Sequence, residues 1–252
     1  WCKANGCLPK GNNNYGKDAS EGGYKAIPAP GVNDSGRTAR VLTGTGPVSW
    51  SHDGTLEGIW DLNGNIWEWN GGSRTVKGEL QVLVNNNAAD LDHSQAASSA
   101  QWKAIDATTG AYITPNGSGT TANSIKLDWV SGKITYSATI TTQADTSRDC
   151  AFASVTCASS VSAAAQAVLK ALAFLPASAT ASEYEDDHMW MNNGADERAF
   201  FSGGDWGYGA NAGLFALNGN NPRSNSNWNL GFRSALPNSQ MLTAQGLSPS
   251  TW

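Results

Sequence analysis

The stretch GIWDLNGNIWEW, residues 58–69, says most about how this chain folds. Short apolar runs flank Asn63-Gly64, and an Asn-Gly pair in that setting is a strong local signal for a hairpin turn. We therefore expect two short strands joined at this pair. Trp67 and Trp69 are two positions apart, so they share one face of a strand. Packing in the core is the default for such a pair, and stacking against a ligand is the alternative.

Strand and turn patterns extend on both sides of this stretch. Residues 8–58 are rich in Gly, Asn, Pro and Asp with little periodicity, which is typical of long ordered loops. Ser131-Gly132 separates two alternating segments, which are expected to form a hairpin. An acidic loop within 182–194 leads into a strand that contains Met and Trp. Further strands are predicted at 79–84, 124–130, 133–142, 197–202, 213–217 and 230–235.

One segment has the periodicity of an α-helix. Apolar residues recur at helical spacing over 159–175, Ser159 or Ser160 can cap the first turn, and Pro176 ends the helix. Few helices, short strands and long ordered loops together predict an α+β fold. We expect a single domain at 1–236, in which 85–150 is an inserted β-rich segment, followed by a tail at 237–252.

Composition and charge argue against several classes of protein. The 252 residues carry a net charge of −5 and no cluster of Lys or Arg, whereas nucleic-acid-binding proteins usually present a basic patch. No apolar run reaches the ~18 residues that a membrane-spanning helix needs. We therefore expect no nucleic-acid partner and no membrane span.

The four cysteines form two close pairs, Cys2/Cys7 and Cys150/Cys157. Neither pair has the Cys-x-x-Cys spacing of a zinc site, and no histidine lies near either pair. The spacing allows two local disulfides or four free thiols. At least one disulfide is favoured if the protein leaves the cell.

The sequence contains no complete catalytic motif. His188 follows Asp186 and Asp187 and could hold a metal with them, but a solvated acidic loop is the simpler interpretation. An acid–base pair could be drawn from Glu57, Asp61 and Glu68, although Glu68 could equally tether a turn. We therefore expect no catalytic residue, no metal and no cofactor.

A second informative stretch is LNGNNPRSNSNWNLGFR, residues 217–233. It contains six asparagines within twelve residues and then returns to the apolar LGF. Asparagine favours turns and is depleted in strands, so the simplest interpretation is a β-turn loop without a ligand. The alternative is that the asparagines mark a site.

Both stretches resemble one protein family. GIWDLNGNIWEW is similar to the G-x-x-D-(M/L)-x-G-N-V-W-E-W signature of the formylglycine-generating-enzyme branch of the C-type lectin fold. FFSGGDWGYGANAGLFALNGNNPRSNSNWNLGFRSAL, residues 200–236, resembles the end of that branch. It resembles more closely the variable region of diversity-generating retroelement target proteins, and PKGNNNYGKD, residues 9–18, is similar to a loop in phage members. The resemblance covers roughly 1–80 and 165–236.

The resemblance implies a C-type-lectin-like scaffold that presents a mutable ligand-binding face, with 200–236 as the variable region. In such proteins an error-prone reverse transcriptase mutates template adenines, and Asn codons carry two of them. The implied variable, ligand-binding positions are Asp205, Gly207, Tyr208, Asn218, Asn220, Asn221, Asn225, Asn227 and Asn229. The implied flanking scaffold residues are Trp206, Trp228, Phe232 and Arg233.

A display role gives these positions expected geometries. Variable side chains should face water, because surface substitutions usually change stability by no more than about 0.5 kcal/mol. Asn225, Asn227 and Asn229 should lie on one side of an extended chain. Trp228 should pack in the core beneath the face, with ligand stacking as the alternative, and Tyr208 should be an aromatic anchor.

The resemblance further implies an unknown protein or glycan partner on a host or target cell, and a place on a virion or extracellular surface. Three alternatives share the fold. An oxidase of this branch needs a cysteine pair in the C-terminal segment, and no cysteine follows Cys157. A calcium-dependent lectin needs carboxylates that NNPRSN and NWN lack. The third is a structural surface module that binds nothing.

Overall fold

The computed structural model describes residues 8–23, 26–90 and 92–234. Strands and loops make up most of this described part, which contains one α-helix, α2 (Ala163–Ala171). The strands are β1 (Asn33–Asp34), β2 (Arg37–Thr38), β3 (Trp67–Val76), β4 (Glu79–Leu83), β5 (Trp102–Ile105), β6 (Tyr112–Ile113), β7 (Lys126–Val130), β8 (Lys133–Ser137), β9 (Arg148–Ala151), β10 (Thr156–Cys157), β11 (His188–Met191), β12 (Arg198–Ser202), β13 (Leu217–Asn221) and β14 (Leu230–Gly231). Short 3₁₀ helices lie at Val48–Trp50, Val84–Asn86, Phe152–Ser154, Ala181–Tyr184 and Gly209–Asn211.

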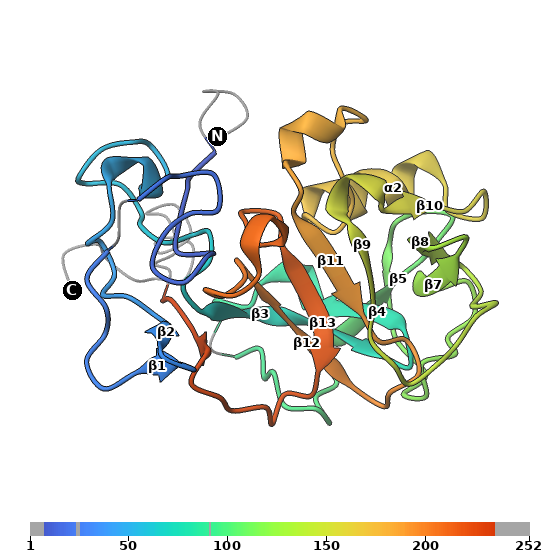
Figure 1. The fold of residues 1–252 in the computed structure, drawn as a ribbon. Helices are drawn as coiled ribbons and strands as arrows, with labels where there is room; N and C mark the ends of the chain where they lie inside the picture. Colours follow the sequence, from blue (N-terminus) through green and yellow to red (C-terminus); the bar gives the residue numbers. More distant parts are fainter. Residues whose placement is uncertain (1–7, 24–25, 91, 235–252) are drawn as a thin grey trace.

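Twelve of the described strands form one sheet (Figure 1). Nine of them follow the order β10-β8-β7-β4-β3-β12-β13-β11-β9, while β14 pairs with β3, β5 with β4, and β6 with β5. β13 lies antiparallel to β12 and parallel to β11, and β14 is parallel to β3. The predicted mixture of short strands, few helices and long loops is confirmed at the level of an α+β, mostly β, protein.

The predicted hairpin around Ser131-Gly132 is confirmed. β7 and β8 pair antiparallel with Val130 opposite Lys133, and both turn residues have positive φ, 50° and 77°. This is the left-handed backbone of a tight hairpin turn. β8 ends at 137 and not at 142, because the chain then turns back and the backbone N–H groups of Thr141 and Thr142 donate to Asp128.

The predicted hairpin at Asn63-Gly64 is wrong, because the polar groups around this pair bind distant loops. Gly64 forms an isolated parallel bridge with Asn12, and the Asn65 N–H donates to the Asn12 carbonyl at 2.7 Å. The Asn65 side chain accepts the N–H of Val41 at 2.8 Å. The turn therefore attaches the N-terminal loops to the start of β3.

Two other predicted elements shift along the chain. The helix begins at 163, because the Ser162 hydroxyl accepts the Ala165 N–H as its cap, whereas Ser160 accepts the N–H of Ala138. The strand expected at 213–217 lies at 217–221, since the Ala216 N–H donates to Gly213 and closes a turn there. The strands expected at 79–84 and 197–202 are confirmed as β4 and β12.

Side chains alternate between the two faces of the sheet. On one face α2 covers the main core, which includes Met189, Met191, Phe200 and Leu217 (Figure 1). On the other face Trp190 and Phe201 belong to a separate aromatic cluster. β11 thus contributes methionines to one side and tryptophan to the other, as the two-residue period of a strand requires.

The segment 85–150 is built into the same sheet as the rest of the chain, through β5 to β8 and most of β9. Cys150 and Cys157 are free thiols, so the disulfide alternative is wrong for this pair. Cys2, Cys7 and the predicted tail at 237–252 lie outside the described residues. Within those residues, no helix has the length and apolar character that crossing a membrane would require.

Candidate functional site

An aromatic cluster forms the base of the candidate site. Trp67 lies at its centre, with ring centroids 5.5 Å from Trp190, 5.2 Å from Phe201 and 5.1 Å from Tyr208, all in edge-to-face geometry. Trp69 packs edge-to-face on Phe201 at 4.9 Å. Edge-to-face packing places the positive rim of one ring on the negative face of the next. The prediction that Trp67 and Trp69 pack on one face of a strand is confirmed.

The loop after β12 delivers Tyr208 to this cluster. Gly203 and Gly204 have φ values of 93° and 83°, which favour glycine. A Cβ on Gly204 would also meet Ala212. Tyr208 is partly buried, and burial followed by the neighbouring Asp205 raises the pKa of its phenol. Its ring is therefore an aromatic group at the boundary between cluster and solvent.

Asp205 is buried, contrary to the expectation that variable side chains face water. Its carboxylate accepts the Gly207 N–H at 2.9 Å and the Asn229 amide at 2.7 Å. Burial raises the pKa of this carboxyl, while these two donors oppose the shift. The Asp205–Asn229 hydrogen bond joins the beginning and the end of the predicted variable positions, so Asp205 acts as an internal structural contact of the site.

β13 carries three of the predicted positions at different depths. Asn218 is 4% exposed, which again contradicts the water-facing expectation, because β13 runs between β12 and β11. Its side-chain oxygen accepts the N–H of Asn220 at 2.9 Å. Asn220 is partly buried and donates to the Ser147 hydroxyl at 2.6 Å, and Asn221 accepts from the Asn225 amide at 3.0 Å. These side-chain bonds lie within β13, connect it to the following loop, or join it to Ser147 just before β9.

The three alternating asparagines do not lie on one side of an extended chain. Residues 222–229 contain two turns, in which Asn225 N–H donates to Pro222 and Leu230 N–H donates to Asn227. Asn225 reaches back to β13, Asn229 binds Asp205, and exposed Asn227 accepts the N–H of Trp228 at 2.8 Å. Local side-chain-to-backbone bonds of this kind favour turns over strands.

The flanking scaffold residues also differ in burial. Trp206 is 3% exposed and donates its indole N–H to Asp34 at 3.2 Å. Trp228 packs on it at 4.7 Å yet is 41% exposed, so the expectation of a core position is wrong. The two rings meet at a tilt of 52°, and much of the Trp228 side chain remains in solvent. Phe232 is 78% exposed, so this scaffold residue projects into solvent.

Glu68 and Arg233 join the two stretches that the sequence singled out. The guanidinium donates through Nε at 2.7 Å and through one terminal nitrogen at 2.6 Å to the two carboxylate oxygens. It also donates to the carbonyls of Trp60 and Asp61, at 3.1 and 3.3 Å. The sequence left two roles open for Glu68, as part of an acid–base pair or as a tether for a turn. This bidentate pair with Arg233 fits the tether.

Two of the acid–base candidates, Asp61 and Glu68, are close enough for their charges to interact, and Arg233 donates to the Asp61 carbonyl and to the Glu68 carboxylate. Glu57 is exposed, whereas burial raises the pKa of Asp61 to about 6. His188 pairs with Asp149 at 2.9 Å rather than with its neighbours in sequence. Among the described residues, no group of three or more His, Cys, Asp or Glu side chains is arranged to hold a metal ion.

Asp187 has a structural position beneath the variable region. It is 3% exposed, and its carboxylate accepts the N–H of Phe215 at 2.7 Å. Burial raises its pKa to about 7, with further contributions from Glu185 and Asp186. A Cβ on Gly213 would meet this carboxylate, so the glycine allows the loop to approach. Asp187 therefore supports the chain at residues 213–215, within the predicted variable region.

Sequence reasoning missed Trp190 and Ser147 as members of the site, and it considered His188 only as a possible metal ligand. Trp190 was assigned to a strand, but its place in the aromatic cluster depends on the parallel pairing of β11 with β13. His188 lies on the same face and stacks on Trp190 at 5.6 Å. The alternation of His188 and Trp190 within one strand was the available signal.

Comparison with known proteins gives no family for the chain. No protein-family model matches it, and no curated protein matches it. A functional assignment rests on the geometry described above and on the pattern of residues in the two stretches.

Proposed function

We propose that this protein is a variable ligand-binding protein with a C-type-lectin-like fold, diversified by a retroelement through mutation of template adenines. The proposed binding face is formed by the loop after β12, by β13 and by the loop that leads to β14. Its ligand would be a protein or glycan on a host or target cell, met from a virion or bacterial surface. No catalytic step is part of this function.

The supporting observation is the division of the variable region by burial. Four of the residues proposed to stay fixed are buried: Gly203, Gly204, Trp206 and Gly213. Phe215, Leu230 and Gly231, also proposed to stay fixed, are partly buried. The proposed mutable positions are mostly exposed or partly exposed: Gly207, Tyr208, Asn220, Asn221, Asn225, Asn227 and Asn229. Mutation is tolerated where side chains reach solvent, so this division suits a scaffold that carries changeable positions. The exceptions are Asp205 and Asn218, which are proposed to vary but are buried, and Phe232 and Arg233, which are proposed to stay fixed but are exposed.

The pairing of β14 with β3 gives further support. Leu230 lies opposite Trp67, and the Glu68–Arg233 ion pair joins the same two segments 165 residues apart. The end of the first motif, in β3, therefore contacts the end of the second motif, at β14 and Arg233. The positions proposed to vary lie in the chain that precedes β14. A binding loop held at both ends by a rigid scaffold loses little conformational entropy on binding.

The chemistry of the face favours recognition by aromatic and amide groups. Tyr208 and Trp228 offer partly exposed rings, and Asn220, Asn225 and Asn227 offer amides that donate and accept. Tyr and Asn are common in adaptable binding loops because they combine contact area with hydrogen bonding. The small apolar surface of this copy predicts weak binding.

The oxidase alternative finds no support in the described residues. Its copper site would need a cysteine pair in the C-terminal segment, where the sequence has none. Cys150 is a buried member of the core under α2, and burial raises its pKa, so its thiol is neither accessible nor activated.

The decisive test is genomic. The DNA near this gene should contain a reverse-transcriptase frame and a second copy of the segment for 200–236 that differs mainly at adenines. The asparagines should match the template, and Asp205, Gly207 and Tyr208 should differ from it. A gene without such a repeat would refute the retroelement origin.

A protein-level test follows from the burial pattern. Libraries randomised at Gly207, Tyr208 and Asn227 should yield folded proteins with altered binding to panels of host-cell surfaces. The control library, randomised at buried Asn218, should yield mostly unfolded protein. If no member of the first library binds any surface, a structural module without a ligand becomes the better description.

A further inference from the structure

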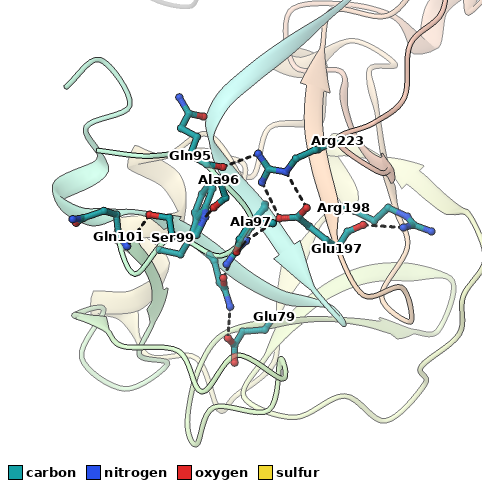
Figure 2. A network of polar contacts seen from close by, with 12 residues as sticks. Glu79, Gln95, Ala96, Ala97, Ser99, Gln101, Glu197, Arg198 and Arg223 are labelled. Carbon is teal, nitrogen blue, oxygen red and sulfur yellow. Dashed lines mark hydrogen bonds and ion pairs between the residues drawn. The ribbon is translucent and has the colours of Figure 1, made fainter. Parts of the chain in front are cut away.

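Arg223 lies in the middle of the asparagine-rich loop, yet its side chain is committed to the protein. Its guanidinium donates through Nε at 3.0 Å and through a terminal nitrogen at 2.8 Å to the two oxygens of Glu197. Its other terminal nitrogen donates to the carbonyl of Gln95 at 2.7 Å (Figure 2). A fork that matches both carboxylate oxygens fixes orientation as well as distance.

Glu197 holds a second arginine at the same time. The Arg74 guanidinium donates to it at 2.8 Å, has only 8% of its side chain exposed, and lies 4.3 Å above the ring of Trp102. Both arginines lower the pKa of Glu197, and the hydrogen bond from Arg223 is the largest cause. The carboxylate therefore joins an exposed loop to a buried cation.

The inserted segment supplies the other half of this contact. Three consecutive carbonyls at 95–97 accept N–H groups from Arg223, Trp102 and Arg74, at 2.7, 2.9 and 2.8 Å respectively. Figure 2 shows these carbonyls beside Glu197 and Arg223. Cationic donors to backbone carbonyls form strong hydrogen bonds, so this short stretch is a rigid support for the loop.

The polar chain continues into the interior of the sheet. Arg74 donates to Gln81 at 2.9 Å, and Gln81 donates to Glu79 at 2.8 Å. Glu79, at the lower end of this path in Figure 2, is fully buried. It also accepts the Ser124 hydroxyl at 2.8 Å. Each named link in this path has a hydrogen-bonded partner, which is what makes a buried polar network rigid.

We propose that Glu197 is a positioning residue for the binding face and that it fixes the loop 222–229 against the inserted segment 85–150 through Arg223. The inference rests on the proposed function only in treating this loop as part of the face. It also assigns a role to the insert, which supports the loop from outside the variable region. Arg223 is then a constant position within a changeable stretch.

The test is hydrogen exchange on the whole protein without ligand, so its outcome does not depend on whether a ligand exists. Arg223→Gln removes the loop's side of the contact and leaves the Glu197–Arg74 pair intact. The amides of Asn225 and Trp228 should then exchange on the order of tenfold faster, while β3 and β12 keep their protection. Arg223→Lys should recover only part of the protection, because an ammonium cannot make the bidentate contact.

Two control variants separate this role from general effects. Ser226→Ala changes an exposed residue in the same loop, and Lys133→Gln removes an exposed positive charge from β8. Both should leave the loop amides at the rate of the parent protein. Unchanged protection in Arg223→Gln, or a uniform loss over the whole sheet, would overturn the proposal.

The genomic repeat gives a second readout. If Arg223 must stay constant, its codon should be one of the arginine codons without adenine, CGC, CGT or CGG. An adenine-bearing codon with substitutions at 223 among sibling copies would contradict a positioning role and leave the retroelement origin intact.

Discussion

The raised pKa of Asp187 predicts how the stability of this fold depends on pH. The carboxyl ionises near 3.8 in an unfolded chain, and burial raises its pKa to about 7 in the folded protein. Between these values the folded state binds more protons than the unfolded state, so the free energy of unfolding falls as pH rises. The stability from this group is complete below the unfolded pKa and is lost as pH rises through the folded pKa.

The size of the effect follows from the shift. About three pKa units at 1.36 kcal/mol each correspond to about 4 kcal/mol between pH 4 and pH 8. Asp187 is 3% exposed, so solvent screening does not reduce this figure greatly. Asp187→Asn removes the titration while its amide oxygen can still accept the N–H of Phe215.

The measurement is urea unfolding of both proteins at intervals from pH 4 to pH 8. The unfolding free energy of Asp187→Asn minus that of the parent should rise by about 4 kcal/mol over this range. Taking the difference cancels the contribution of Asp61, whose pKa is also raised by burial. Asp92→Asn is the control, because this aspartate is exposed and, unlike Asp186, is not a cause of the raised pKa of Asp187. Its replacement should change stability by no more than about 0.5 kcal/mol. A difference that is flat or falls with pH would refute the reasoning.

Four further substitutions test the packing and the ion pair of the site. Trp67→Ala should reduce the unfolding free energy by about 3–5 kcal/mol in urea, because Trp67 is the buried centre of the aromatic cluster. Trp228 is half-exposed, so Trp228→Ala should reduce the unfolding free energy by less than about 2 kcal/mol. Equal reductions for the two tryptophans would contradict a central role for Trp67 in the aromatic cluster. Gly219→Ala should lower the melting temperature at a cost of about 1–3 kcal/mol, since its Cβ would lie 2.6 Å from the Phe200 ring. Glu68→Gln should reduce the unfolding free energy in urea by about 1–2 kcal/mol, because it weakens the partly exposed ion pair with Arg233. An unchanged unfolding free energy would contradict the tethering role of Glu68.

The elements predicted correctly from sequence are those whose partners are close in the chain. The β7–β8 hairpin is set by Ser131-Gly132, and α2 by an apolar stripe that ends before Pro176. Asn63-Gly64 carries an equally clear local signal, but its partner is Asn12, which lies in a loop about fifty residues earlier. A local rule cannot anticipate a contact that forms only when distant loops meet.

The sequence proposed candidate positions for the site but could not predict how deeply each side chain is buried. Codon reasoning named Asp205 and Asn218 as changeable, yet whether they reach solvent depends on which strands flank them. Asn218 is buried because β13 enters between two strands made earlier in the chain. The Glu197–Arg223 contact joins two segments whose relation has no sequence signature.

The central position of β13 has a consequence for the synthesis of the protein. Its neighbours β12 and β11 both precede it in the chain, so this part of the sheet cannot form until residues 217–221 have left the ribosome. Contacts between distant segments form slowly, and the waiting strand edges are open to association with other chains. If the segment is diversified as proposed, each new version must complete the sheet as well as recognise a ligand. Chaperone demand and expression yield should therefore vary among sibling proteins most strongly with substitutions at Asn218.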